Sequence, residues 1–194
     1  MTEDAPHNAL QFGWEEWVAL PDLGVPALKA KVDTGARTSA LHAFDIETFG
    51  PASKPKVRFT VHPIPGRDDL VIPCSAVIVD RREVASSNGE RELRYVINST
   101  LSVNGDSWPI ELTLTNRSTM TSRMLLGRQA LKDHISIVAT DRFLQPELNY
   151  DVYHSAQMRS AQPKRSLRIC VLSREDNYST RRLVEEGEAR GHSV

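Results

Sequence analysis

The chain has 194 residues, of which 40% are hydrophobic and 25% are charged, and its formal net charge is −1. This composition is typical of one ordinary globular domain with additional segments. The near-zero charge excludes attraction to nucleic acid or membranes by the overall field, so charge-based recognition must come from local clusters. Residues 1–8 are followed by no long apolar run, which argues against a signal peptide, and no stretch reaches the roughly 18 apolar residues of a membrane helix.

The two cysteines, Cys74 and Cys170, fall in segments that we expect to belong to separate units. They predict no disulfide framework. A reducing, cytoplasmic location therefore fits the chain best.

Short apolar runs separated by turn residues predict a chain built mostly of strands. We expect the polar residues 1–12 to be disordered and residues 21–24 to form a turn. The alternation is clear in residues 56–62, where Val57, Phe59 and Val61 share one face. The predicted strands span, in chain order, residues 14–20, 25–32, 38–46, 56–62, 70–80, 92–103, 108–114, 124–126 and 135–139.

Two hairpins are predicted among these strands. Residues 70–80 and 92–103 flank a tip at Ser86-Ser87-Asn88-Gly89, and Asn104-Gly105-Asp106 forms the second turn. Asn-Gly between strand-like runs is a strong hairpin signal. One or two helical turns are expected at residues 128–133. The fold class is therefore mainly β, a small barrel or sandwich with one short helix on its C-terminal side.

The last part of the chain has a different pattern. Residues 146–166 are polar and aperiodic, which indicates a linker. Residues 167–172 form a compact apolar strand, and Ser179 or Thr180 is placed to begin a helix that runs to about residue 190. This is a β-α unit, and one such unit cannot bury its own faces. We therefore expect residues 167–194 to be the first part of a longer domain.

The motif Val32-Asp33-Thr34-Gly35-Ala36 is typical of half the active site of an aspartic peptidase. That chemistry needs two carboxylates that share one proton and act on a single water. The sequence contains one Asp-Thr-Gly, so a two-fold homodimer would supply Asp33 twice. The small Thr34 and Gly35 would allow the tight loop. Taken alone, the motif also fits an ordinary β-turn.

Residues 33–43, Asp-Thr-Gly-Ala-Arg-Thr-Ser-Ala-Leu-His-Ala, resemble the signature of a bacterial family labelled ATP-dependent zinc proteases. Residues 81–97 also resemble that family, and Met124-Leu125-Leu126-Gly127-Arg128 resembles the strand and helix of retropepsins. The resemblance spans about residues 14–141. It implies a retropepsin-like barrel over residues 13–145, with Asp33 as the catalytic residue.

The C-terminal residues resemble a second family. Residues 167–174 and 178–183 are similar to the opening of ATP-grasp ligases that add glutamates to the tail of a ribosomal protein. The resemblance implies a fusion of a peptidase with a glutamate ligase. Because the chain stops before the ATP site of such a ligase, no ATP binding is expected of it.

Basic residues around the motif predict an acidic substrate. Typical retropepsins carry an acid after Asp-Thr-Gly-Ala, whereas this chain has Arg37. Arg37 and Arg128 would lie near the dyad, where guanidinium groups bind carboxylates or brace the site. We expect an oligo-glutamate tail as substrate, which the ligase resemblance also indicates.

The hairpin tip is predicted to cover the cleft as a flap. Its residues Ser87, Asn88 and Gly89, together with Lys31, Arg81 and Arg94, would then add to substrate binding. For Arg81, Arg82 and Arg91, solvated charges on the hairpin are an equal alternative.

A metal site has weak support. The sequence contains no His-Glu-x-x-His motif and no Cys-x-x-Cys pair. Only His42 is near Asp33, and a packed strand histidine explains it better than a ligand does. We therefore expect no cofactor, although a zinc peptidase stays an alternative. The six histidines are His7, His42, His62, His134, His154 and His192.

Two further alternatives are open. Ser39, Ser87 and Ser99 are possible nucleophiles, but none lies in a Gly-x-Ser-x-Gly motif. In the second alternative, the β domain is not an enzyme but a binding module that presents glutamate tails to the ligase or regulates the ligase. Such a module needs the arginines but not Asp33.

Overall fold

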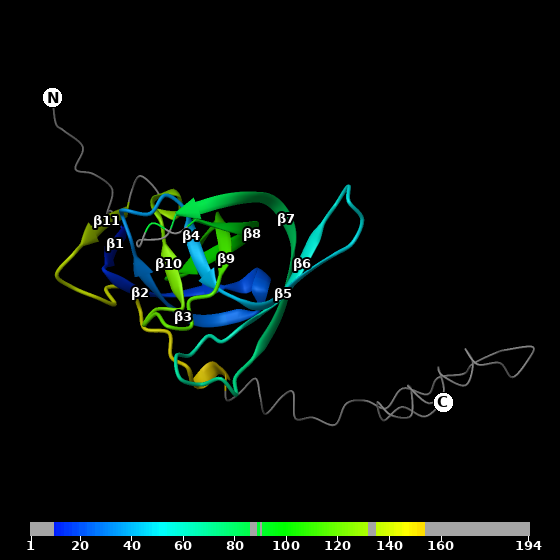
Figure 1. Cartoon of the computed structure of the whole chain (residues 1–194). Helices are drawn as coiled ribbons and strands as arrows, with labels where there is room; N and C mark the ends of the chain where they lie inside the picture. The colour runs from blue at the N-terminus through cyan, green and yellow to red at the C-terminus, as the bar shows by residue number, and fades with distance from the viewer. Residues whose placement is uncertain (1–9, 86–88, 90, 132–134, 154–194) are drawn as a thin grey trace, which may run out of the picture. The chain divides into compact units, whose positions relative to one another are not determined.

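The computed structural model describes residues 10–85, 89, 91–131 and 135–153 (Figure 1). The chain divides into two compact units, residues 1–152 and 153–194, and the first contains every element described below. Its strands and 3-10 helices are β1 (Leu10–Gly13), β2 (Glu15–Leu20), η1 (Pro21–Leu23), β3 (Val25–Val32), β4 (Ser39–His42), β5 (Phe44–Phe49), β6 (Lys56–Val61), β7 (Ile72–Ala85), β8 (Arg91–Val103), β9 (Asp106–Thr115), β10 (Met124–Leu126), η2 (Arg128–Ala130) and β11 (Ile135–Val138).

Nine strands within the described ranges form one sheet in the order β2-β3-β10-β4-β9-β8-β7-β6-β5. β10 lies between β3, to which it is parallel, and β4, to which it is antiparallel. β2 also pairs with β8 at Ala19 and Ser102, so the sheet meets itself at one residue pair. The prediction of a mainly β fold is confirmed, whereas the expected closure of a barrel rests on that single pair.

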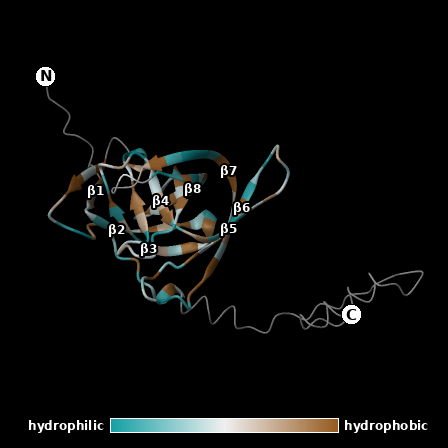
Figure 2. Ribbon diagram, viewed as in Figure 1, coloured by the Kyte–Doolittle hydropathy of each residue, from teal (hydrophilic) through white to brown (hydrophobic). Residues whose placement is uncertain are grey.

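The core follows from the alternation of side chains along the strands. In β6 the buried residues Val57, Phe59 and Val61 alternate with Lys56, Arg58 and Thr60, as the sequence predicted. In β8 the side chains of Val96, Ile97, Leu101 and Val103 are buried. Figure 2 shows hydrophobic residues gathered on the strands, while the upper part of the arc of β7 is hydrophilic. Burial of these side chains is the main favourable term in folding.

Both predicted hairpins are present. β8 and β9 are joined at Asn104 and Gly105, whose φ angles of 52° and 84° are those of a two-residue turn with positive φ at both positions. β7 and β8 form the longer hairpin, and its register ends at Ala85 opposite Arg91. In Figure 1, β7 arcs back toward the rest of the sheet, while the hairpin of β5 and β6 projects away from it.

The beginning of the domain differs from the prediction. Residues 10–12 were expected to be disordered, but they belong to β1, which pairs in parallel with β11 from Leu10 opposite Ile135 to Gly13 opposite Val138. The pairing explains the difference, because the partner strand lies more than a hundred residues away and local sequence does not show it. Residues 1–9 of that prediction lie outside the described residues.

One buried carboxylate holds this pair of strands on the domain. Glu16 is 0% exposed, and its Oε1 accepts the N–H groups of Gly13 at 2.7 Å and Leu144 at 2.8 Å. Its Oε2 accepts the N–H of Gln145 at 3.3 Å. Gly13 allows the close approach, since a Cβ there would lie 2.4 Å from the carbonyl oxygen of Asp141. The carboxylate therefore joins the first and last segments of the domain.

The end of the domain lies beyond the predicted boundary at residue 145. Tyr150 packs edge-on against Trp17 with ring centroids 4.8 Å apart, and Phe143 lies 5.9 Å from the same ring. The Lys29 ammonium lies over the three rings, at 4.8 Å from the centroid of Trp17. The expected linker therefore begins with residues that pack on β2 and β3.

The predicted short helix and the predicted C-terminal segments are described only in part. The expected helix at residues 128–133 is a single 3-10 turn at Arg128–Ala130, and residues 132–134 lie outside the described ranges. The rest of the predicted linker and the predicted ligase fragment at residues 167–194 also lie outside them. In the part of the chain that is described, no helix is long and apolar enough to cross a membrane.

Replacement of the buried carboxylate tests its role in joining the two ends of the domain. We expect Glu16→Ala to lower the free energy of unfolding by about 3 kcal/mol, because the N–H groups of Gly13, Leu144 and Gln145 lose their acceptor, and the bonds from Gly13 and Gln145 are buried. Denaturant unfolding measures the change. The exposed Glu147 is the control, and Glu147→Ala should change stability by less than about 0.5 kcal/mol. Equal stability of the two variants would contradict the assigned role.

Candidate active site

Asp33 lies directly after β3, where the chain leaves the sheet. Its N–H donates to the carbonyl oxygen of Leu126 at 2.9 Å, which continues the pairing of β3 with β10 by one residue. Its Oδ1 accepts the N–H groups of Gly35 at 2.9 Å and Ala36 at 3.2 Å. These contacts leave Oδ2 without a hydrogen bond from the described residues. The loop therefore fixes the carboxylate through one oxygen and presents the other.

Two glycines allow this loop to form as it does. A Cβ on Gly35 would lie 3.1 Å from Oδ1 of Asp33. A Cβ on Gly127 would lie 2.5 Å from the carbonyl carbon of Thr38, a distance that ordinary packing does not allow. Gly127 also donates its N–H to Oγ of Ser39 at 3.1 Å. The end of β10 and the start of β4 are therefore in direct backbone contact beside the Asp33 loop.

Arg128 braces the loop. Its Nη1 donates to the carbonyl oxygens of Thr34 at 2.6 Å and Gly35 at 2.9 Å. Its N–H donates to the carbonyl oxygen of Ala36 at 2.9 Å, and the next residue, Gln129, donates its N–H to that of Arg37 at 3.0 Å. Of the two roles that the sequence predicted for Arg128, these contacts support the bracing one.

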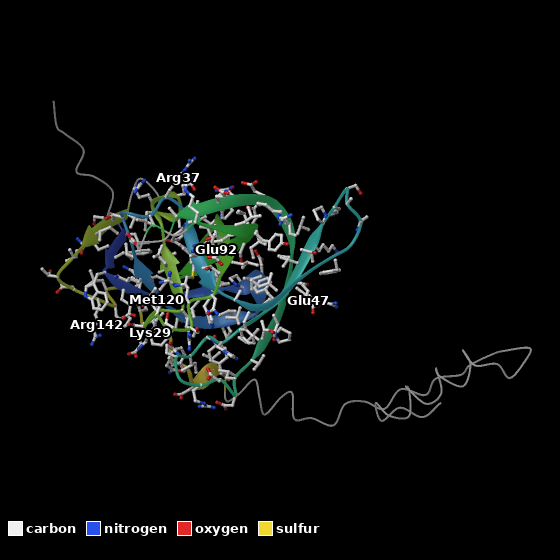
Figure 3. All side chains as sticks on the ribbon, viewed as in Figure 1. Lys29, Arg37, Glu47, Glu92, Met120 and Arg142 are labelled. Carbon is white, nitrogen blue, oxygen red and sulfur yellow. The ribbon has the colours of Figure 1, made fainter. Side chains whose placement is uncertain are left out.

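Arg37 and Lys31 point to solvent. Both side chains are exposed, and neither makes an ion pair with the residues that the structure describes. Figure 3 shows Arg37 beyond the ends of the strands, with its side chain directed away from them. Both are free to meet an acidic partner, but the structure does not bring them against the Asp33 carboxylate.

The arginines of the long hairpin are largely neutralised by their own neighbours. Arg94 pairs with Glu92 at 2.7 Å, Arg82 with Asp80 and Glu111, and Arg91 with Glu83. Arg81 lies over the ring of Tyr95 at 4.9 Å. At the tip, Gly89 is exposed with a φ of 86°, and Ser87 and Asn88 lie outside the described residues. These pairs favour the interpretation of Arg82 and Arg91 as hairpin charges.

Sequence reasoning missed two arginines in the segment between β9 and β10. Arg117 is half-buried and Arg123 is only 6% exposed. Neither forms an ion pair with a described carboxylate. The one signal in the sequence was their place shortly before residues 124–126, the predicted strand that pairs with β3. What the sequence alone did not show is that β10 passes between β3 and β4.

His42 supports this segment as a neutral acceptor. Its Nδ1 accepts the N–H of Arg117 at 2.8 Å. Burial, and then the charges of Arg123, His62 and Arg117, lower the pKa of His42 to about 4. The histidine is therefore uncharged at neutral pH. Within the described ranges, no three His, Cys, Asp or Glu side chains lie together in a way that would hold a metal ion.

The described serines that were suggested as nucleophiles are buried in the fold. Ser39 is 0% exposed, and its Oγ accepts the N–H of Gly127. Ser99 is 3% exposed and has no basic residue as a hydrogen-bond partner among the described residues. Ser87 lies outside them. Asp33 is the candidate that the loop geometry presents for chemistry.

Comparison with known families agrees with this geometry. A profile of the family described as RimB-like, retropepsin-like aspartic endopeptidase RimB, matches residues 11–148. The crystal structure of Lpg0085 from Legionella pneumophila, a protein of unknown function, superposes with a TM-score of 0.58 at 27% identity. The match covers 71% of this chain and 98% of that one. The predicted resemblance to retropepsins is thereby confirmed.

Longer relatives carry a different name. Proteins named "Probable alpha-L-glutamate ligase" are 44% identical over 189 residues in Shewanella pealeana and 39% identical over 184 residues in Desulfotalea psychrophila. The matches cover 96% and 94% of this chain, but only 41% and 40% of those proteins. The chain therefore spans about two fifths of the relatives' length. Their name agrees with the predicted resemblance of the C-terminal residues to a glutamate ligase.

Gly127→Ala tests the close contact beside the loop. We expect it to lower the free energy of unfolding by about 2–3 kcal/mol, because the new methyl group overlaps the backbone of Thr38 and one strand must move. Denaturant unfolding measures the loss. Gly24→Ala is the matched control, since a Cβ at Gly24 meets nothing within 4 Å and only its φ of 66° adds a cost of about 1 kcal/mol. A smaller loss at Gly127 than at Gly24 would contradict the contact.

Proposed function

Because the chain belongs to the RimB-like family of retropepsin-like aspartic endopeptidases, we propose that it is an aspartic peptidase whose active site forms between two copies. The observation that carries the proposal is the loop of Asp33. One carboxylate oxygen is held by two backbone N–H groups, and the other has no hydrogen bond from the described residues. A carboxylate held in this way is positioned to bind a water molecule.

The second carboxylate would come from Asp33 of the other copy. The sequence contains no second Asp-Thr-Gly, and a two-fold axis through the loop would place the same group twice in one site. Thr34 and Gly35 are exposed in the single chain, so the loop is accessible for such a contact. Homodimerisation is thus part of the proposal, since one chain holds only half of the dyad.

The reaction then needs a single shared proton. One carboxylate takes a proton from the water as the water oxygen attacks the peptide carbonyl carbon, while the protonated carboxyl donates to the carbonyl oxygen. The tetrahedral intermediate breaks at the C–N bond when the nitrogen receives a proton. No metal is required for these steps. The arginine brace at Thr34 and Gly35 would keep the loop in place throughout.

We propose an acidic peptide as the substrate, with an oligo-glutamate tail of a ribosomal protein as the specific candidate. Arg37 follows the Asp33 loop and Lys31 lies two residues before Asp33; both are exposed and form no ion pair with a described acid, so positive charge is available beside the loop. The name of the longer relatives supports glutamate chemistry in the same protein. The lengths of the peptides released in the test below distinguish cleavage inside the tail from removal of its terminal residues.

The test is cleavage of a synthetic oligo-glutamate peptide by the protein and by Asp33→Asn, with and without a chelator. We expect Asp33→Asn to reduce the rate by about 10²- to 10⁴-fold, because Asn cannot exchange the proton. The chelator should have no effect. Asp69→Asn is the control: Asp69 is an exposed acid that pairs with Arg67 on its own loop, and its loss should leave the rate unchanged.

Two results would overturn the proposal. Loss of cleavage with the chelator would favour the zinc peptidase. Binding of the peptide by Asp33→Asn, without cleavage by either protein, would favour a module that presents glutamate tails to a ligase.

A further inference from the structure

Arg117 is held in place by β4 and by its own segment. Its backbone N–H donates to Nδ1 of His42 at 2.8 Å, and its Nε donates to the carbonyl oxygen of Ser122 at 3.3 Å. Ser122 in turn lies 3.4 Å from Oε1 of Glu15, on the strand next to β3. The guanidinium of Arg117 is therefore fixed in position by contacts with neutral groups.

The segment of Arg117 lies beside the strands that lead to Asp33, because Glu15, which Ser122 contacts, is opposite Lys31 of β3, two residues before Asp33. Burial lowers the pKa of Arg117, Arg94 lowers it further, and the carboxylate of Asp33 raises it. The carboxylate of Asp33 is therefore one of the charges that act on this guanidinium. No described carboxylate lies within the 4.0 Å of an ion pair with it.

The acids near Arg117 form no ion pair with it, and Glu15 contacts the hydroxyl of Ser122 instead. Arg94 already shares Glu92 with the hydroxyl of Thr115, at 2.7 and 2.8 Å. Arg123, 6% exposed, donates from Nη1 to the carbonyl oxygen of Ser118 at 3.3 Å, and its Nε has no hydrogen-bond partner among the described residues. His42 is neutral. Residues 116–123 therefore carry two arginines and no acid of their own in a partly buried place, and a buried cation without a paired anion is costly.

We propose that Arg117 is a specificity-determining residue, which binds the side-chain carboxylate of a substrate residue next to the bond that is cleaved. Arg123 adds positive charge from the same segment. A carboxylate ligand satisfies guanidinium donors with paired hydrogen bonds and removes the charge imbalance. The inference deepens the proposed function and rests on it. It assigns recognition of the acidic side chain to Arg117 in place of Arg37 and Arg128.

The experiment compares an oligo-glutamate peptide with a series in which one glutamate at a time is glutamine. We expect the protein to cleave one member of the series about 10- to 100-fold less efficiently than the parent peptide, because one charge-assisted contact is lost. Arg117→Gln should cleave the parent that much more slowly, and should no longer distinguish it from that member. Arg117→Lys should keep part of the discrimination, since the charge remains.

The matched control is Arg58→Gln, which removes an exposed arginine paired with Glu47 on the projecting hairpin. It should leave both the rate and the discrimination unchanged. A purely structural role of Arg117 would slow cleavage of every peptide by the same factor. That result, or full discrimination by Arg117→Gln, would overturn the inference.

Binding separates this inference from the proposed function. Fluorescence anisotropy with labelled oligo-glutamate measures affinity for Asp33→Asn alone and for Asp33→Asn with Arg117→Gln. If no peptide is cleaved, the peptidase proposal fails, and a 10-fold or greater loss of affinity in the double variant still supports the carboxylate site. Equal affinity of the two proteins would overturn it.

Discussion

The candidate site depends on one backbone contact, the approach of the end of β10 to the loop that follows β3. The N–H of Asp33 binds the carbonyl oxygen of Leu126, and Gly127 touches the backbone of Thr38 with no room for a side chain. Arg128 also binds the loop carbonyl oxygens of Thr34 and Gly35. These contacts preorganise the loop, and preorganisation is what electrostatic catalysis requires.

Charge is distributed unevenly around this loop. The hairpin of β7 and β8 carries many arginines, yet its acids neutralise most of them. The segment between β9 and β10 carries two arginines and no matching acid among the described residues. A site that is to bind acidic peptides needs such an unmatched charge close to the reacting group. Paired charges contribute less, because a ligand must first compete with the existing partner.

Much of the fold was predictable from local pattern. Residues 25–32 and 56–61 have apolar residues at strand spacing, and residues 124–126 are a short apolar run. Asn104-Gly105 is a turn that few other residue pairs form so readily. The ion pairs of Arg94 with Glu92 and Arg82 with Asp80 were also within reach, since residues two apart on a strand share a face.

What the sequence did not show depends on contacts between distant segments. The strand at Leu10–Gly13 needs its partner at Ile135–Val138, and Tyr150 becomes part of the domain only by packing on Trp17. The position of Arg117 depends on the placement of β10 between β3 and β4. The local sequence does not show this topology. The candidate catalytic residue was therefore found from a motif, and the neighbouring arginine only from the fold.

The central claim is that two copies share one active site, and subunit mixing tests it most directly. The protein is unfolded and refolded with a nine-fold excess of Asp33→Asn, and oligo-glutamate cleavage is measured per wild-type chain. If both aspartates are needed, random pairing leaves about one tenth of the wild-type chains in intact dimers, and activity per wild-type chain falls to about that fraction. Activity per wild-type chain that does not change on mixing would show that each chain works alone, and would contradict the account.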